Sequence, residues 1–222
     1  MILCLVTDRR RLGAALRLGP GEWFDAVRAQ VFAAAVAGID LVQVREPDLE
    51  AADLLRLAKT LVADTAHTPT RIIVNDRLDV ALASGAAGVH LKERSFSVEV
   101  ARPSTPPDFL IGRSVHELAM QGFPGNADYL VAGTVQPTVS KPTVTCLGWE
   151  GLATLVRSAA GRPVLAIGGI DLPSIPLVVA SGAAGLAAIG AFIPEPGQGL
   201  AEFVQKRVIA MRLGFDSAQP VS

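Results

Sequence analysis

Short runs of apolar and β-branched residues recur along the whole chain, at intervals that leave room for a helix between them. Most runs are nearly continuous in hydrophobicity, which is typical of parallel strands buried on both faces. We expect eight strands, at residues 2–8, 39–46, 71–76, 87–91, 109–115, 128–135, 163–169 and 185–190.

Segments with a helical period separate these strands. Apolar residues recur three and four positions apart over 24–35 and over 54–62. Glycine-containing turns, such as the near-repeat ASGAAG at 83–88 and 180–185, end several helices just before a strand. A last helix is expected around 199–212. Strands that alternate with helices pair in parallel through right-handed crossovers.

Eight strand–helix units within 222 residues predict an α/β protein with a single (β/α)₈ TIM barrel. A doubly wound open sheet shows the same alternation, so periodicity leaves that alternative open. No linker rich in Pro and Ser divides the chain, and the stretch at 102–107 is expected to be a surface joint beside a short helix. We therefore expect one domain over 1–215 and a frayed tail over 216–222.

Charge and composition narrow the class of protein. Lys and Arg number 20 and Asp and Glu 21, a balance that does not suit a nucleic-acid or membrane-surface protein. The two cysteines, Cys4 and Cys146, make neither a disulfide framework nor a metal cluster. No stretch approaches the length of a membrane span, and no basic segment precedes the first apolar run, so we expect no signal peptide. These features predict a soluble, reduced, cytoplasmic protein.

Polar residues gather at one end of the predicted strands. In a barrel of this class the active site lies at the carboxyl ends of the strands, and the expected strands turn polar there. Each residue alone could serve a turn or a helix cap; Asp76, for instance, could cap a helix that begins near Arg77. Together they predict a site, made by Thr7, Asp8, Gln43, Arg45, Glu46, Asn75, Asp76, His90, Ser114, His116 and Thr134.

Two further features predict a bound phosphate. Glycines follow the last two strands, in AIGGI at 166–170 and AAIGAFI at 187–193, where backbone N–H groups can approach an anion. The stretch VAGTVQPTVSKPT at 131–143 begins as a buried strand and ends in hydroxyls and a lysine held between two prolines. Hydroxyl donors and an ammonium on such a stiff loop suit a phosphate ester.

The strand ends, in this order, resemble the thiamine phosphate synthase/thiazole tautomerase (TenI-type) family of (β/α)₈ barrels. The most specific segments are VQVRE, VNDRLDVALASGAAGVHL, IGRSVHE, GTVQPTVSKP and VLAIGGI, and the similarity covers nearly the whole chain. The resemblance implies an enzyme late in thiamine biosynthesis. A synthase of this family joins hydroxymethylpyrimidine pyrophosphate to a thiazole phosphate with Mg²⁺, and a tautomerase aromatises the thiazole phosphate.

Carried over by position, the resemblance assigns residues to both substrates. Asp76 would be a Mg²⁺ ligand if the chain is a synthase. The pyrimidine would meet Gln43, Arg45 and Asn75, with Ser114 nearby. The thiazole phosphate would be held by Thr138, Ser140, Lys141, Gly169 and the backbone of Ile189 and Gly190.

Three positions depart from the family pattern. Pro47 stands where a synthase has a lysine that reaches the pyrophosphate, and Ser95 stands where we align a second acidic metal ligand. Both changes would impair pyrophosphate departure, which depends on charge stabilisation. Glu93 or Lys92 would compensate only in part. Thr134 stands where a tautomerase can carry a proton-transferring histidine, and we keep it as a substrate-binding residue.

A tautomerase without that histidine needs another group to move the proton. The candidate catalytic residues are His116, Glu46 and Lys141, with His90 a weaker candidate. A buried structural role for His90 and His116 stays open. His67 lies in a polar joint, where a solvated role fits better.

We expect an enzyme that binds a thiazole phosphate at the carboxyl face of the barrel and belongs to the TenI-like tautomerase branch, without a cofactor. A true synthase that uses Mg²⁺ is the alternative, and a non-catalytic barrel that binds a thiamine precursor is the second one. A Schiff-base aldolase would need Lys92 or Lys141. The expected partners are a small phosphate ester and a second copy of the chain in a homodimer.

Overall fold

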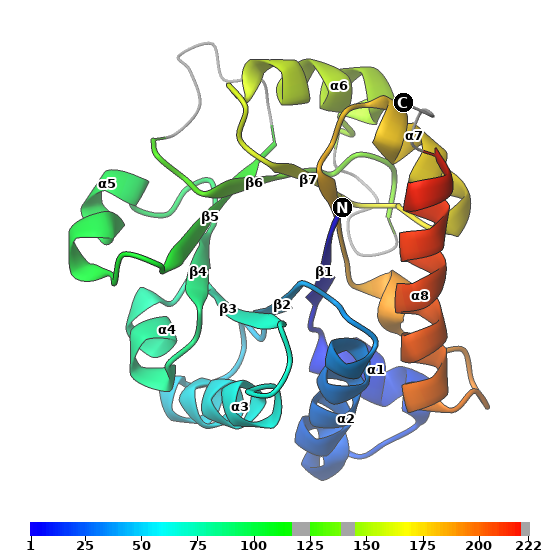
Figure 1. Ribbon diagram of the computed structural model, residues 1–222. Helices are drawn as coiled ribbons and strands as arrows, with labels where there is room; N and C mark the ends of the chain where they lie inside the picture. The colour runs from blue at the N-terminus through cyan, green and yellow to red at the C-terminus, as the bar shows by residue number, and fades with distance from the viewer. Residues whose placement is uncertain (117–124, 139–144, 219–222) are drawn as a thin grey trace.

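The computed structural model describes residues 1–116, 125–138 and 145–218. Eight parallel strands close into a barrel in the order β1 to β8, with helices around the outside (Figure 1). Every predicted strand is present, so the (β/α)₈ barrel is confirmed and the open sheet is wrong. The strands are β1 Ile2–Val6, β2 Leu41–Val44, β3 Arg71–Asn75, β4 Gly88–Leu91, β5 Leu110–Val115, β6 Tyr129–Ala132, β7 Val164–Ile167 and β8 Gly185–Ala188.

The helices of the described residues range from single turns to long rods. The α-helices are α1 Arg9–Leu16, α2 Trp23–Val36, α3 Ala51–Asp64, α4 Leu78–Ser84, α5 Val98–Ala101, α6 Gly148–Ser158, α7 Ile175–Ala180 and α8 Leu200–Ala218. Four short 3₁₀ turns accompany them, η1 Pro20–Glu22, η2 Arg102–Ser104, η3 Leu172–Ser174 and η4 Gly190–Phe192. The short α5 and η2 form the surface joint that the sequence predicts near 102–107.

Two hydrophobic clusters hold the barrel together. The larger lies between strands and helices, and the predicted stripe of α2 contributes Val27, Val31 and Ala34 to it. The smaller fills the inside of the barrel and includes Tyr129 of β6. The neighbouring strand β5 carries Gly112, because a Cβ atom there would lie 2.2 Å from Cζ of Tyr129. One aromatic ring thus occupies space that a side chain on β5 would otherwise need.

The ASGAAG near-repeat marks two equivalent joints from helix to strand. Gly85 follows α4 with φ +72°, and Gly182 follows α7 with φ +78°. Glycine adopts this left-handed conformation without steric cost, so each helix ends abruptly and the chain turns into the next strand.

The first and last helices differ from the prediction. Helix α1 was not predicted; its N-cap Asp8 accepts a hydrogen bond from the backbone N–H of Arg11 at 3.0 Å. Helix α8 continues to Ala218, so residues 216–218 of the expected tail are helical, and 219–222 lie outside the described residues. Among the helices described here, none is both long and apolar enough to cross a membrane.

Candidate active site

The carboxyl ends of β2 and β3 bring two side-chain amides together. Gln43 lies buried in β2, and Asn75 is the last residue of β3. Nε2 of Gln43 donates a hydrogen bond to Oδ1 of Asn75 at 2.8 Å, which orients both amides. An amide supplies donors and acceptors, so this pair can recognise a heterocycle that carries both.

A buried histidine lies on the next strand. Nε2 of His90 in β4 is 2.8 Å from Oγ of Ser114 in β5, and the ring of Tyr129 lies 5.8 Å away between centroids. Burial lowers the pKa of His90 to about 4, against the opposing charge of Asp76. Its Nδ1 atom has no hydrogen-bond partner among the described residues. A neutral imidazole therefore holds the hydroxyl of Ser114.

Asp76 faces the loop after β4. Its backbone is left-handed, with φ 60°, and Arg77, not Asp76, occupies the N-cap position of α4, without a side-chain cap hydrogen bond. The helix-cap interpretation of Asp76 is therefore wrong. Nζ of Lys92 lies 2.7 Å from Oδ2 of Asp76, and the hydroxyl of Ser95 donates to Oδ1. Burial acts to raise the pKa of Asp76, but the contacts with Lys92 and Ser95 outweigh it and leave that pKa lowered.

A small cavity opens beside this ion pair. Its volume is about 130 Å³, which fits one part of a substrate, since whole drug-sized ligands need roughly 300–1,000 Å³. It lies at the carboxyl ends of β2, β3 and β4, as the sequence predicts for the site. The lining residues are Glu46, Pro47, Leu49, Leu54, Asn75, Asp76, Arg77 and Lys92.

The groups around Asp76 do not fit the Mg²⁺ ion that the family resemblance implies for a synthase. Mg²⁺ needs oxygen ligands in near-octahedral order, usually one or two carboxylates with substrate phosphates. Both Asp76 oxygens already have partners, one of them an ammonium, and Ser95 replaces the second carboxylate. Glu93 instead pairs with His116, with Oε2 3.1 Å from Nδ1. Over the described ranges, no three His, Cys, Asp or Glu side chains could hold a metal together.

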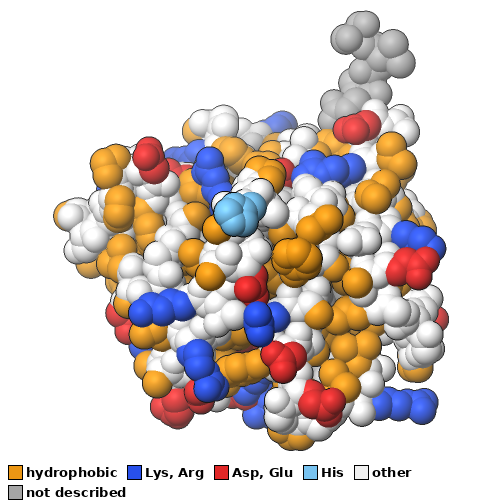
Figure 2. Space-filling view, turned by 60° about the horizontal axis from the view of Figure 1, so that its bottom comes forward, with side chains coloured by type: hydrophobic (Ala, Val, Ile, Leu, Met, Phe, Trp, Pro, Cys, Tyr) orange, Lys and Arg blue, Asp and Glu red, His pale blue; other side chains and the backbone are white. Residues whose placement is uncertain are grey.

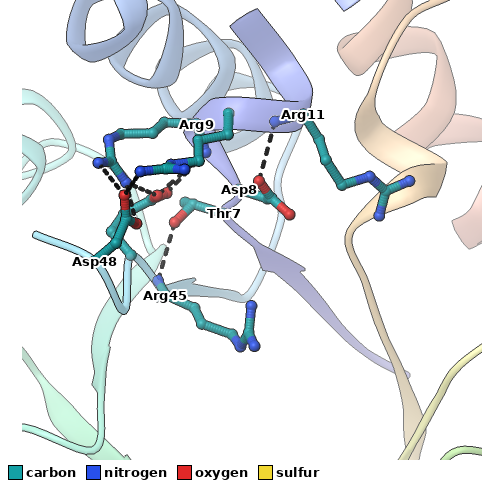
Figure 3. A network of polar contacts seen from close by, with 8 residues as sticks. Thr7, Asp8, Arg9, Arg11, Arg45 and Asp48 are labelled. Atoms are coloured by element: carbon teal, nitrogen blue, oxygen red, sulfur yellow. Dashed lines mark hydrogen bonds and ion pairs between the residues drawn. The ribbon is translucent and has the colours of Figure 1, made fainter. Parts of the chain in front are cut away.

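Glu46, predicted as a catalytic base, lies in an ion pair that joins the loops after β1 and β2. Its Oε2 is 3.0 Å from Nη1 of Arg9, whose guanidinium also contacts both oxygens of Asp48, at 2.6 and 2.7 Å (Figure 3). Burial raises the pKa of Glu46, while hydrogen bonds from Thr7 and Arg9 act against the rise. The contact with Arg9 gives Glu46 a structural role at the mouth of the barrel.

Arg113 of β5 fixes the loop that carries Lys92. Its guanidinium is buried and donates to the backbone carbonyls of Phe96, Glu93 and Ser95, at 2.6, 2.7 and 3.1 Å. Three carbonyls held by one planar group restrict the path of this loop. The positions of Lys92 and Ser95 beside Asp76 therefore follow from the packing of β5.

The structure describes only part of the predicted phosphate site, because residues 139–144 lie outside the described residues. Gly168 and Gly169 after β7 are left-handed, with φ +101° and +64°, and a Cβ atom on Gly169 would lie 2.7 Å from the carbonyl oxygen of Pro137. The loops after β6 and β7 thus approach each other through glycine. Thr134 is buried and Thr138 half-buried here, whereas the predicted ligands Ser140 and Lys141 lie outside the described residues. Ile189 and Gly190 follow β8, and η4 begins at Gly190.

The sequence did not indicate Arg11 as a candidate site residue, although its guanidinium lies on the predicted phosphate side. A Cβ atom on Gly190 would lie 3.3 Å from Nη2 of Arg11, so the guanidinium lies directly beside the loop after β8. Figure 3 shows the side chain extending away from the cluster of Arg9 and Asp48. Its only sequence signal is a position three residues after Asp8, on a helix that was itself not predicted.

A larger cavity than the one beside Asp76 lies elsewhere. It measures about 620 Å³, and its lining residues precede or begin β3 to β6, at the amino ends of the strands. These ends carry none of the predicted site residues, so position and chemistry, and not size, select the carboxyl face. The lining residues are Arg71, Ala87, Pro107, Asp108, Phe109, Leu110 and Asp128.

The fold and the strand ends define a (β/α)₈ barrel with a candidate active site at its carboxyl face. The model of the thiamine monophosphate synthase family matches residues 20–192. A thiamine-phosphate synthase of Clostridium botulinum is 35% identical over 196 residues, 87% of this chain and 90% of that protein. One of a Roseiflexus species is 35% identical over 215 residues, 96% of this chain and 86% of that protein. The chain belongs to the thiamine monophosphate synthase family of enzymes, which confirms the resemblance.

One solved structure agrees with this family, and a second shares the fold. The thiamine phosphate pyrophosphorylase of Pyrococcus furiosus superposes with a TM-score of 0.77 at 32% identity, over 99% of this chain and 97% of that one. The 3-hexulose-6-phosphate synthase of Salmonella typhimurium is 12% identical with a TM-score of 0.65, over 95% and 100% of the two chains. The second likeness concerns the fold alone.

Proposed function

We propose that the chain is a thiamine-phosphate synthase, a transferase that joins hydroxymethylpyrimidine pyrophosphate to a thiazole phosphate. The observation that carries this proposal is that two cations, Lys92 and Arg11, lie on opposite sides of the barrel mouth. Lys92 follows β4, and Arg11 lies beside Gly190 after β8. In the closed order of eight strands, β4 and β8 lie half the barrel apart. A reaction between two phosphorylated substrates needs two anion sites, whereas a tautomerase needs one.

The relatives support the synthase, which was the alternative, over the tautomerase that we expected. Those from Clostridium botulinum and Roseiflexus carry the synthase name at 35% identity. The site also favours it, because Thr134 offers no base, Glu46 is paired with Arg9, and His116 is paired with Glu93. His116 remains a candidate for acid–base work only if a tautomerase activity exists.

In the proposed reaction the thiazole nitrogen attacks the methylene carbon of the pyrimidine. The new C–N bond forms as the C–O bond to pyrophosphate breaks, and pyrophosphate leaves with the electron pair. Gln43 and Asn75 orient the pyrimidine ring. Ser114 of β5 lies nearby, hydrogen-bonded to His90 of β4. The main demand is stabilisation of negative charge on the leaving group, so no general base is required for this step.

Replacement of Gln43 tests whether the pyrimidine and the thiazole phosphate bind at separate sides of the barrel mouth. We expect Gln43→Leu to raise the KM for the pyrimidine pyrophosphate about tenfold, since one lost hydrogen bond is worth about 1 kcal/mol and its unpaired partner adds to the loss. The KM for the thiazole phosphate should stay unchanged. Gln198→Leu, in an exposed loop, is the matched control and should change neither constant. An equal rise in both constants would contradict separate sides.

A homodimer is part of the proposal. Helix α2 exposes Phe32 and Val36, and the neighbouring α8 exposes Ile209 and Leu213, each by more than half. Figure 2 brings the bottom of Figure 1 forward and shows hydrophobic side chains among charges of both signs. Large apolar side chains on adjacent helices suit the centre of an interface between two copies. The cytoplasmic location stays a prediction.

A further inference from the structure

Lys92 places a positive charge beside Asp76, the carboxylate that the family resemblance assigns to Mg²⁺. Its Nζ lies 2.7 Å from Oδ2 of Asp76, and its backbone N–H lies 3.4 Å from Oδ1. The hydroxyl of Ser95 donates to the same Oδ1. One residue and its loop therefore contact both oxygens of Asp76.

The surrounding structure keeps this arrangement in place. The backbone N–H of Asp76 donates to the carbonyl of His90 at 2.8 Å, which ties the end of β3 to β4. The guanidinium of Arg113 holds three carbonyls of the loop after β4. The ion pair between Lys92 and Asp76 thus joins two segments that are already anchored.

The ammonium is also within reach of a ligand. The Lys92 side chain is 54% exposed and lines the 130 Å³ cavity at the carboxyl face. An ammonium has three N–H donors, so the bond to Asp76 leaves donors for another acceptor. A doubly charged metal would have to compete with this cation for the same carboxylate, since like charges repel.

We propose that the Lys92 ammonium, held by Asp76, binds the pyrophosphate group of the substrate directly and supplies the positive charge for which the family pattern uses Mg²⁺. The role rests on the proposed synthase function. As the C–O bond breaks, charge grows on the pyrophosphate oxygens, and the ammonium donates hydrogen bonds to them. Lys92 then offsets the losses at Pro47 and Ser95 with a cation of the chain itself.

Binding of inorganic pyrophosphate in the presence of EDTA tests this role without turnover. Titration calorimetry on the full chain should detect binding, and Lys92→Met should weaken it about 10- to 100-fold, the usual effect of one charge-assisted hydrogen bond. Lys59→Met, an exposed lysine on α3, is the matched control and should leave the affinity unchanged. Equal affinities for the Lys92 and Lys59 variants would overturn the proposal, as would binding by the wild type only after Mg²⁺ is added.

A second variant tests whether the Lys92 ammonium takes the place of Mg²⁺. Lys92→Gln combined with Ser95→Asp removes the ammonium and restores the second carboxylate of the family pattern. We expect Mg²⁺ to strengthen pyrophosphate binding to this double variant at least tenfold and to have little effect on the wild type. The same response to Mg²⁺ in both proteins would contradict the substitution of a metal by Lys92.

The two proposals fail in different ways. Formation of thiamine phosphate that stops in EDTA would sustain the synthase and reject the role of Lys92. Pyrophosphate binding that depends on Lys92, without any thiamine phosphate from the two substrates, would reject the synthase and leave an anion site of another use.

Discussion

At the scale of single residues, the interior of the barrel holds a histidine that stays neutral. His90 is 2% exposed, its Nε2 contacts Ser114, and its Nδ1 has no partner among the described residues. Burial without an anionic partner in contact disfavours the imidazolium, so the pKa falls to about 4. Protonation of this side chain therefore destabilises the folded state.

The stability of the protein should depend on pH through His90. Its pKa is about 4 in the folded state and 6.5 in the unfolded reference, so the contribution is fully present above pH 6.5 and is lost as the pH falls towards 4. The loss amounts to about 3 kcal/mol, from 1.36 kcal/mol for each pKa unit. Urea unfolding from pH 7.5 to 4.5 should show a smaller decrease for His90→Gln than for the wild type. The exposed His67→Gln should behave as the wild type does; parallel curves for all three would exclude a neutral His90.

The sequence predicts where the site residues lie but not which of them pair. Gln43, Asn75 and Ser114 could be placed because each interrupts an apolar strand at its carboxyl end. The ion pair of Asp76 with Lys92 joins two different loops, and that of Glu46 with Arg9 spans 37 positions. Such contacts depend on how neighbouring loops pack, which no local pattern records.

At the scale of elements, one arginine connects the start of α1 to the loop after β2. The side chain of Arg9 is 9% exposed and that of Glu46 is 2% exposed. The backbone N–H of Arg9 also donates to Oε1 of Glu46 at 3.1 Å. Asp48 completes the contact, and its pKa is lowered by the hydrogen bonds from Arg9. These bonds set the position of two loops that border the site.

Loss of this connection should destabilise the fold. Arg9→Met leaves the Glu46 carboxylate buried without its cation, and we expect the free energy of unfolding to fall by about 3 kcal/mol. Arg10→Met is the control: Arg10 also contacts Asp48, at 2.6 Å, but its side chain is 65% exposed. That variant should lose less than about 1 kcal/mol. Guanidinium denaturation measures both; equal losses would show that burial does not set the strength of the Arg9 contacts.

The strands could be predicted because hydrophobicity is nearly continuous through each of them. Helix α1 could not, since RRRLGAAL has three arginines and a glycine in eight residues and no long apolar stripe. It has a local cap at Asp8 and a tertiary contact, the pairing of Arg9 with Glu46. Arg11, the candidate site residue that the sequence did not indicate, lies on this same helix.

At the scale of the whole molecule, the outer face of α2 and α8 should join two copies of the 23.1 kDa chain. We expect sedimentation velocity to show a dimer for the wild type. Phe32→Lys combined with Ile209→Lys places charge at the centre of the interface and should give a monomer. Val100→Lys, on an exposed apolar residue of α5, should remain dimeric. A wild-type monomer at all concentrations would reject the interface.

The most direct test of the synthase assignment is the product formed from both substrates. The purified chain should be supplied with hydroxymethylpyrimidine pyrophosphate and thiazole phosphate, and the products followed by mass spectrometry. The assignment predicts thiamine phosphate and pyrophosphate in equal amounts, only when both substrates are present. Absence of thiamine phosphate with and without Mg²⁺, while the thiazole phosphate tautomer is converted to the aromatic form, would contradict it and restore the tautomerase.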